Sequence, residues 1–295
     1  MSAELNSILK HKAINEWRLF WLVSIPMCAV MVFAMMGVDL SSAAGVSHMI
    51  QFSVRWAVPF IFLVVATSSL QILFPGPFPS WLLRNRKYIG LCFAVAMAWQ
   101  GLFIFIMSNF FAGYYYEEVF YLRDELEGST GYLFLTAMVV TSFRFGRKHL
   151  SPKQWKLLHK SGLYFLWAYP FSVYWWNLSY YPDPEPIDYV FYWGGFLAFA
   201  LRIAAWSKRR RQAAIRNSPD NTTPLARMVL GGMVIAFGLL AASTGREWQK
   251  PVTEFLLAPE WSANLVLWLP YWPFEHYLSL FIIGLGAMLA TRGED

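Results

Sequence analysis

The sequence predicts an all-α integral membrane protein with eight membrane-crossing helices. Of its 295 residues, 57% are hydrophobic and 14% are charged, whereas a soluble domain has about 25% charged residues. So few charges do not cover a surface that faces water, which excludes a soluble enzyme and a disordered chain. Several charge-free runs are also long enough to cross the ~30 Å of hydrocarbon in a bilayer.

The first half of the chain contains four such runs. Residues 19–38 exceed the roughly 7–15 apolar residues of a signal peptide, so we interpret this run as a retained anchor. The second run, 56–74, ends at the proline cluster of residues 75–79, a strong helix breaker. The third begins at 88 and meets no charge before 117, and the fourth, 128–143, is short but flanked by charge on both sides.

The second half contains four more runs. The fifth, 161–180, ends in an acidic segment rich in proline. The sixth, 187–206, carries Arg202 near its end, where a long side chain can reach the membrane interface. The seventh and eighth runs are 228–244 and 272–291.

The basic residues alternate between loops as these eight crossings require. With the N-terminus inside, all but four of the 24 Lys and Arg residues fall in inner segments; the exceptions are Arg55, Arg123, Arg246 and Lys250. Because Lys and Arg concentrate on the cytoplasmic side of membrane proteins, we expect both termini in the cytoplasm. The net charge of +6 therefore reflects orientation, and we expect no nucleic-acid partner.

Polar side chains inside the expected spans are the candidate functional residues, because each needs a partner in the bilayer. Gln100 follows Gly90 by ten residues, which places it ~15 Å into the third span. We expect its amide to bond a neighbouring helix, with a ligand or quinone contact as the alternative. His159 lies at the inner mouth of the fifth span, where it is either a polar cap or a cofactor ligand. The sequence shows no catalytic set, phosphate loop or metal-ligand spacing.

Aromatic residues cluster where the spans are expected to leave the outer side. This placement is typical of the belt that Trp and Tyr form at a membrane interface. The clusters are residues 114–116, 175–176, 180–181 and 271–272.

Two pairs of sequence blocks resemble the ferric reductase-like transmembrane family, which includes the haem-binding membrane subunit of the bacterial methionine sulfoxide reductase system. The first pair is residues 67–75, TSSLQILFP, and residues 81–91, WLLRNRKYIGL. The second is residues 131–143, GYLFLTAMVVTSF, and residues 155–164, WKLLHKSGLY. The resemblance covers residues 53–206.

This resemblance implies a six-helix core that holds b-type haem between histidines on facing helices and passes electrons across a bacterial inner membrane. His159 matches the histidine of the family motif Trp-x-x-Leu-His. The other family histidines fall on Gln100, on Met97, and at Ser172 or Val173. Because six-coordinate haem needs two axial donors, usually imidazoles, we expect the fold to be retained without the haem. Met97 with His159 is the alternative ligand pair, since Met can ligate haem iron.

We therefore expect four regions. Residues 1–18 form a cytoplasmic segment, 19–206 the ferric reductase-like core, and 207–227 a basic cytoplasmic loop. Residues 228–295 form a two-helix extension, in which 251–270 lies in the membrane interface. Without haem, large aromatic side chains are expected to fill the core, because an empty cavity is destabilising: Trp99, Phe165, Trp167, Tyr169, Phe171 and Tyr174.

The expected function is that of a haem-free accessory or scaffolding subunit of a membrane complex. Its partners would be the lipid bilayer and a membrane or cytoplasmic protein. The alternative is a membrane redox subunit that passes electrons through b-type haem or a quinone, with a separate chain as electron donor.

Overall fold

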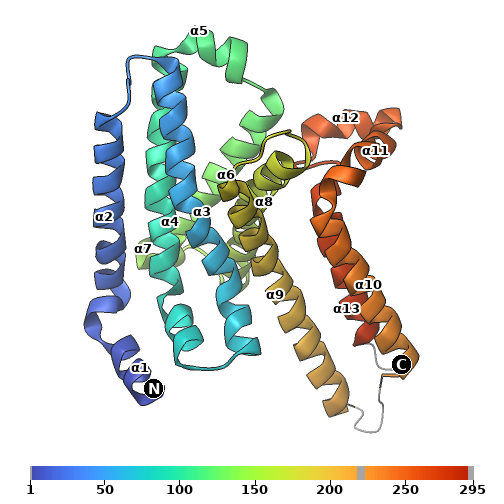
Figure 1. The fold of residues 1–295 in the computed structure, drawn as a ribbon. Coiled ribbons are helices and arrows are strands. Elements are labelled where there is room, and N and C mark those ends of the chain that lie inside the picture. Colours follow the sequence, from blue (N-terminus) through green and yellow to red (C-terminus); the bar gives the residue numbers. More distant parts are fainter. Residues whose placement is uncertain (1, 218–222, 292–295) are drawn as a thin grey trace. The chain divides into compact units, whose positions relative to one another are not determined.

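The structure is a computed structural model that describes residues 2–217 and 223–291, and within them every regular element is a helix (Figure 1). Five helices are long and apolar enough to cross a membrane. They are α2 (Glu16–Met36), α3 (Ala43–Leu73), α4 (Pro77–Phe110), α9 (Pro186–Asn217) and α10 (Leu225–Ser243). The chain is therefore an all-α, multi-pass membrane protein.

Helices also lie at the other three positions where the sequence predicts spans. They are α6 (Leu122–Thr141), α8 (Pro152–Ser179) and α13 (Leu278–Ala290). Acidic residues occupy the first turn of α6, basic residues occur in the first turns of α8, and α13 has only 13 residues. That these three helices also cross the bilayer stays a prediction.

The third span begins earlier than the sequence predicts. The break after α3 is confined to residues 74–76, and α4 begins at Pro77 rather than at Tyr88. Proline is accommodated in the first turn of a helix, because the N–H groups there have no intrahelical acceptor. Pro77 and Pro79 therefore start a helix instead of prolonging a loop, and the basic residues that follow them are helical.

The sixth span is longer than predicted at its basic end. α9 continues beyond residue 206 to Asn217, so the first part of the expected loop 207–227 is helical, while residues 218–222 lie outside the described residues. Lys208 donates a hydrogen bond to the carbonyl oxygen of Ile72 at 2.8 Å. This bond satisfies one of the last carbonyl groups of α3, which have no partner within their own helix.

The chain folds into two compact units. Unit 1 comprises Met1–Thr67 and Gly76–Trp167, and unit 2 comprises Ser68–Pro75 and Ala168–Asp295. This division differs from the boundary after residue 206 that the sequence suggested, because α9 packs against α13.

One end of unit 1 gathers three basic segments of the chain. The starts of α2 and α4 meet there: Asn85 accepts a hydrogen bond from the Glu16 N–H at 2.8 Å and donates one to Asn15 Oδ1 at 2.9 Å. The end of α6 lies at the same place, since Lys87 Nζ is 4.8 Å from the Phe143 ring centroid. Within unit 1 these segments therefore share one side, as the alternation of charge predicts.

A buried apolar cluster closes the opposite end of unit 1. It joins the start of α3, the end of α4 and the π-helical turn η2 (Tyr115–Val119). The short helix α5 (Ala112–Tyr114) lies beside this end (Figure 1). The buried members of the cluster are Val46, Met49, Phe103, Met107 and Tyr115.

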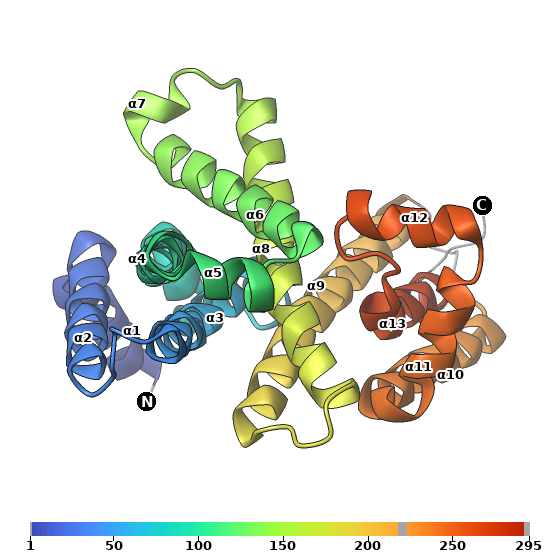
Figure 2. The same cartoon turned by 90° about the horizontal axis from the view of Figure 1, so that it is seen from above.

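In unit 2, α10 and α13 lie side by side in close contact (Figures 1 and 2). A Cβ added to Gly231 would lie 2.6 Å from the Gly286 carbonyl oxygen, and one added to Gly286 would lie 2.7 Å from that of Gly231. Small residues allow helix backbones to approach this closely in membrane proteins. The pair is therefore held by packing that a larger side chain would prevent.

The segment between α10 and α13 contains two short helices, α11 (Gly245–Leu257) and α12 (Glu260–Trp268). They run across the end of the α10–α13 pair rather than along it (Figure 2). Both are shorter than a membrane span, which suits the expected interfacial placement of residues 251–270.

Of the six aromatic side chains expected to fill a core, all but Tyr169 are buried or half-buried, each within its own unit. Trp167, Phe171 and Tyr174 are buried, and the half-buried Trp99 stacks on Phe103. Tyr169 is 37% exposed, so its assignment to the core was wrong. Residues two apart lie on different faces of a helix, and Tyr169 is therefore directed away from the face that carries Trp167 and Phe171.

Candidate functional site

Gln100, the family-histidine position of α4, is bonded to α6. The Tyr132 hydroxyl lies 2.9 Å from Gln100 Oε1 and 3.1 Å from the Met97 carbonyl oxygen. The Tyr132 ring packs against Gly101, where an added Cβ would come within 3.4 Å of it. The predicted hydrogen bond between Gln100 and a neighbouring helix is therefore confirmed, and the backbone of Met97 shares the same donor.

His159 lies in the first turns of α8, half-buried against the end of α6. Its Nε2 atom is 3.0 Å from Thr141 Oγ1, and its ring centroid is 4.3 Å from that of Trp155. Trp155 in turn donates from Nε1 to the Thr141 carbonyl oxygen at 3.1 Å. Two aromatic side chains of α8 thus cap the C-terminal end of α6.

The imidazole of His159, which precedes the expected span 161–180, is neutral at pH 7. Burial, with the nearby charges of Arg86 and Arg147, lowers the pKa of His159 to about 4. A neutral imidazole has one donor and one acceptor nitrogen. It can therefore bond the Thr141 hydroxyl, and it is also the form of histidine that ligates metals.

The remaining family-histidine positions, Ser172 and Val173, lie in unit 2. Ser172 is buried, and its hydroxyl donates to the Ala168 carbonyl oxygen at 2.8 Å and lies 3.1 Å from the Tyr277 hydroxyl. Val173 is exposed. Ser172 follows His159 by thirteen residues, which is ~20 Å along α8.

These side chains do not fit a six-coordinate b-type haem. Such a haem needs a strong donor on each face of the iron, usually an imidazole. The five aligned positions provide one imidazole, His159; the amide of Gln100 is engaged by Tyr132 and the hydroxyl of Ser172 by Tyr277. The resemblance to the family therefore extends to sequence blocks but not to the ligand set.

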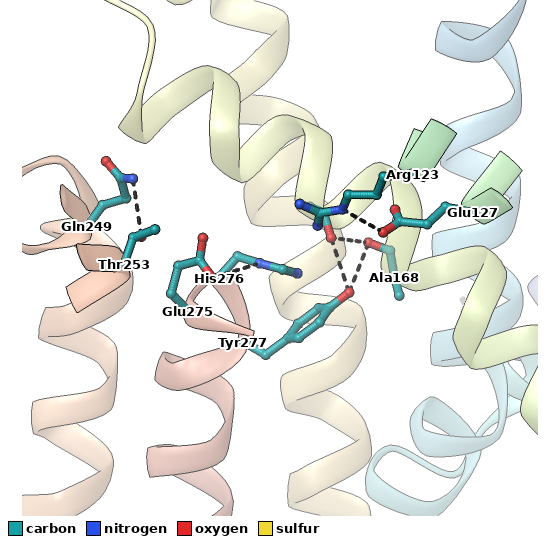
Figure 3. Close-up of polar contacts among 9 residues, drawn as sticks. Arg123, Glu127, Ala168, Gln249, Thr253, Glu275, His276 and Tyr277 are labelled. Atoms are coloured by element: carbon teal, nitrogen blue, oxygen red, sulfur yellow. Dashed lines mark hydrogen bonds and ion pairs between the residues drawn. The ribbon is translucent and has the colours of Figure 1, made fainter. Parts of the chain in front are cut away.

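A second group of residues that could take part in proton or ion chemistry lies just before α13, in the 3-10 turn η3 (Glu275–Tyr277). The side chains of Glu275 and His276 are 0% and 2% exposed, and His276 Nδ1 is 3.9 Å from Glu275 Oε2 (Figure 3). Tyr271 and Phe274 precede the pair with positive φ angles of 63° and 67°. Such angles are unfavourable for residues other than glycine, so the surrounding packing holds this turn in place.

Aromatic rings surround the His276 imidazole. The ring centroids of Tyr277, Trp175 and Tyr271 lie 3.9, 5.9 and 6.4 Å from that of His276. The assignment of Trp175 and Tyr271 to an interfacial belt was wrong, because both are buried in unit 2, and so was that of Tyr115, which is buried in unit 1. The positions of Trp175 and Tyr271 at the expected ends of spans are typical of an interfacial belt, but both side chains pack against His276 inside unit 2.

An adjacent carboxyl and imidazole can form an ion pair or share one proton. Ionisable residues inside membrane proteins commonly line proton or ion pathways. The pair escapes a search by motif because a Glu-His dipeptide is not specific. The available signal was an acid beside a histidine at the start of an otherwise charge-free run.

No protein-family model, curated protein or solved structure matches this chain. The ferric reductase-like resemblance therefore rests on the sequence blocks of residues 67–91 and 131–164.

Proposed function

We propose that this chain is a haem-free accessory or scaffolding subunit of a membrane complex, built on a ferric reductase-like core in a bacterial inner membrane. The observation that carries the proposal is the contact between Gln100 and Tyr132. At the position where the family has a haem-ligating histidine on this helix, the chain has an amide bonded to a tyrosine of the next helix. That side chain joins two helices, and it is a poor axial donor to iron.

The same change from ligand to packing contact is found at Ser172, which bonds within unit 2. Loss of the ligands with retention of helix contacts supports a role in assembly. The partner in such a role is a membrane or cytoplasmic protein that carries the chemistry of the complex.

A membrane redox subunit that passes electrons through b-type haem or a quinone is the second candidate. His159 favours it, because this imidazole matches the family motif and is neutral at pH 7. The haem-dependent form of this second candidate differs from the accessory subunit in one measurable property, which is the haem content of the protein.

The test is the visible absorption spectrum of the purified chain before and after reduction by dithionite. We expect no sharp b-type bands, because the second imidazole is missing. Expression in cells supplied with excess haem precursor makes the result independent of haem supply.

His149→Ala is the matched control for His159→Ala, since His149 is exposed and belongs to the neighbouring loop. Stoichiometric haem that is lost in His159→Ala and kept in His149→Ala would overturn the proposal and establish the redox subunit.

A further inference from the structure

Aromatic rings position a lysine at the basic end of unit 1. Lys87 Nζ, from the first third of α4, lies over three rings, with centroid distances of 5.8, 5.8 and 4.8 Å to Trp17, Tyr88 and Phe143. Cation–π attraction holds a charged group in one place without neutralising it. Lys87 is therefore fixed while its full charge stays available.

Arg147 is held in the same way at the end of α7 (Arg144–Arg147). Its guanidinium carbon lies 4.2 Å from the ring centroid of Trp155, and its backbone N–H donates to the Phe143 carbonyl oxygen at 2.9 Å. Phe143 thus links the two cations, since its ring contacts Lys87 and its backbone anchors the helix of Arg147.

Carboxylates of the described residues do not neutralise the two cations. Among the residues that the structure describes, neither Lys87 nor Arg147 has a carboxylate oxygen within 4.0 Å. In residues 6–18, 76–90 and 141–160 together, Glu16 is the single acid against twelve Lys and Arg residues.

Exposed aromatic side chains beside the cations favour a lipid over a soluble anion. Phe145 is 61% exposed and its ring stacks on Phe143, while Trp17 is 41% exposed beside Lys87. A phospholipid presents a phosphate and apolar chains to such a surface together. We propose that Lys87 and Arg147 form a binding site for the headgroup of an anionic phospholipid, whose chains pack against Trp17 and Phe145.

A defined site differs from the diffuse attraction that any basic loop exerts on anionic lipids. The strength of diffuse attraction depends on the number of basic residues, whereas lipid binding at a defined site depends on the particular basic residues that are held over aromatic rings. Lys153 and Lys156, on the exposed first turns of α8, supply the matched control. Within the described part of the chain, neither contacts an aromatic ring.

The experiment is native mass spectrometry of the purified full chain titrated with phosphatidylglycerol or with phosphatidylcholine. The wild type should retain phosphatidylglycerol more strongly than phosphatidylcholine. Lys87→Gln with Arg147→Gln should weaken its retention by about 25-fold, because each of the two lost basic residues contributes roughly a fivefold factor near a lipid surface. Lys153→Gln with Lys156→Gln removes the same charge and should leave retention within about twofold of the wild type, because salt screens exposed charges that lie outside the site.

Equal losses in the two double variants would overturn the proposal in favour of diffuse attraction. Displacement of the lipid by excess inorganic phosphate would overturn it in favour of a soluble anion. The charge-preserving pair Lys87→Arg with Arg147→Lys must retain the lipid. If the glutamine pair does not fold, the test is the thermal unfolding midpoint of the wild type with each lipid. A larger rise with phosphatidylglycerol than with phosphatidylcholine would support the site, and equal rises would overturn it.

Discussion

At the scale of single residues, one tyrosine hydroxyl bonds two neighbouring residues of α4. Tyr132 lies within hydrogen-bonding distance of Gln100 Oε1 and of the Met97 carbonyl oxygen. In the bilayer, an amide at this depth needs such a partner, because water is not available to replace it. The contact joins α4 to α6 through a side chain of each helix.

We expect Gln100→Leu and Tyr132→Phe each to lower the free energy of unfolding by about 0.6–2 kcal/mol. Both changes remove the same hydrogen bond, so the double variant should cost less than the sum of the two. Equilibrium unfolding in mixed detergent micelles measures all three. Tyr121→Phe is the control, because Tyr121 is 67% exposed; strictly additive costs would show that the two side chains are not coupled.

At the scale of elements, the α10–α13 pair depends on glycines at its contact. Gly231 faces backbone atoms of α13, with an added Cβ only 2.6 Å from the Gly286 carbonyl oxygen and 2.7 Å from the Ala290 nitrogen. Backbone atoms do not rotate away as a flexible side chain can. A larger residue must therefore push the two helices apart.

Gly231→Val should destabilise unit 2 by about 1–3 kcal/mol, the usual cost of overpacking. Gly232→Val is the matched control, because a Cβ at Gly232 meets nothing within 4 Å. Both variants carry the same change in helix propensity and hydrophobicity. Thermal unfolding in detergent distinguishes them, and equal midpoints for the two variants would contradict the close packing described here.

At the scale of the whole molecule, the orientation of the chain is tested at α6 and α8, two of the helices whose crossing stays a prediction. We expect reporter fusions after Tyr121 and after Asp183 to face the outer side, and a fusion after Ser151 to face the cytoplasm. Ser151 lies between α6 and α8, whereas the other two positions precede α6 and follow α8. The physical basis is the retention of Lys and Arg on the cytoplasmic side.

A phosphatase that is active only outside and a fluorescent protein that matures only inside report the two sides independently. Identical results at residues 121 and 151 would remove α6 as a span, and identical results at 151 and 183 would remove α8. Either outcome would reverse the orientation of everything that follows.

The sequence by itself determined the membrane class, and a helix lies at each of the eight positions where it predicts a span; five of these helices are long and apolar enough to cross a bilayer. These properties can be recognised within a single run of residues, because the thickness of the bilayer fixes how long an apolar run must be to cross it. Helix ends were less well determined, since a proline that ends one helix can start the next, as at Pro77. The polar partner of Gln100 was predictable in kind, because an amide at that depth must be bonded.

Only the tertiary structure decided which residue that partner is and which aromatic side chains turn inward. Tyr132 is 32 residues from Gln100 in sequence, and Trp175 is about a hundred residues from His276. The burial of Glu275 and His276 follows from such distant neighbours, and the two residues alone do not imply it. A span's hydrophobicity is set by its own residues, but burial and hydrogen bonding depend on which helix lies beside it, and that choice is made by packing along the whole chain.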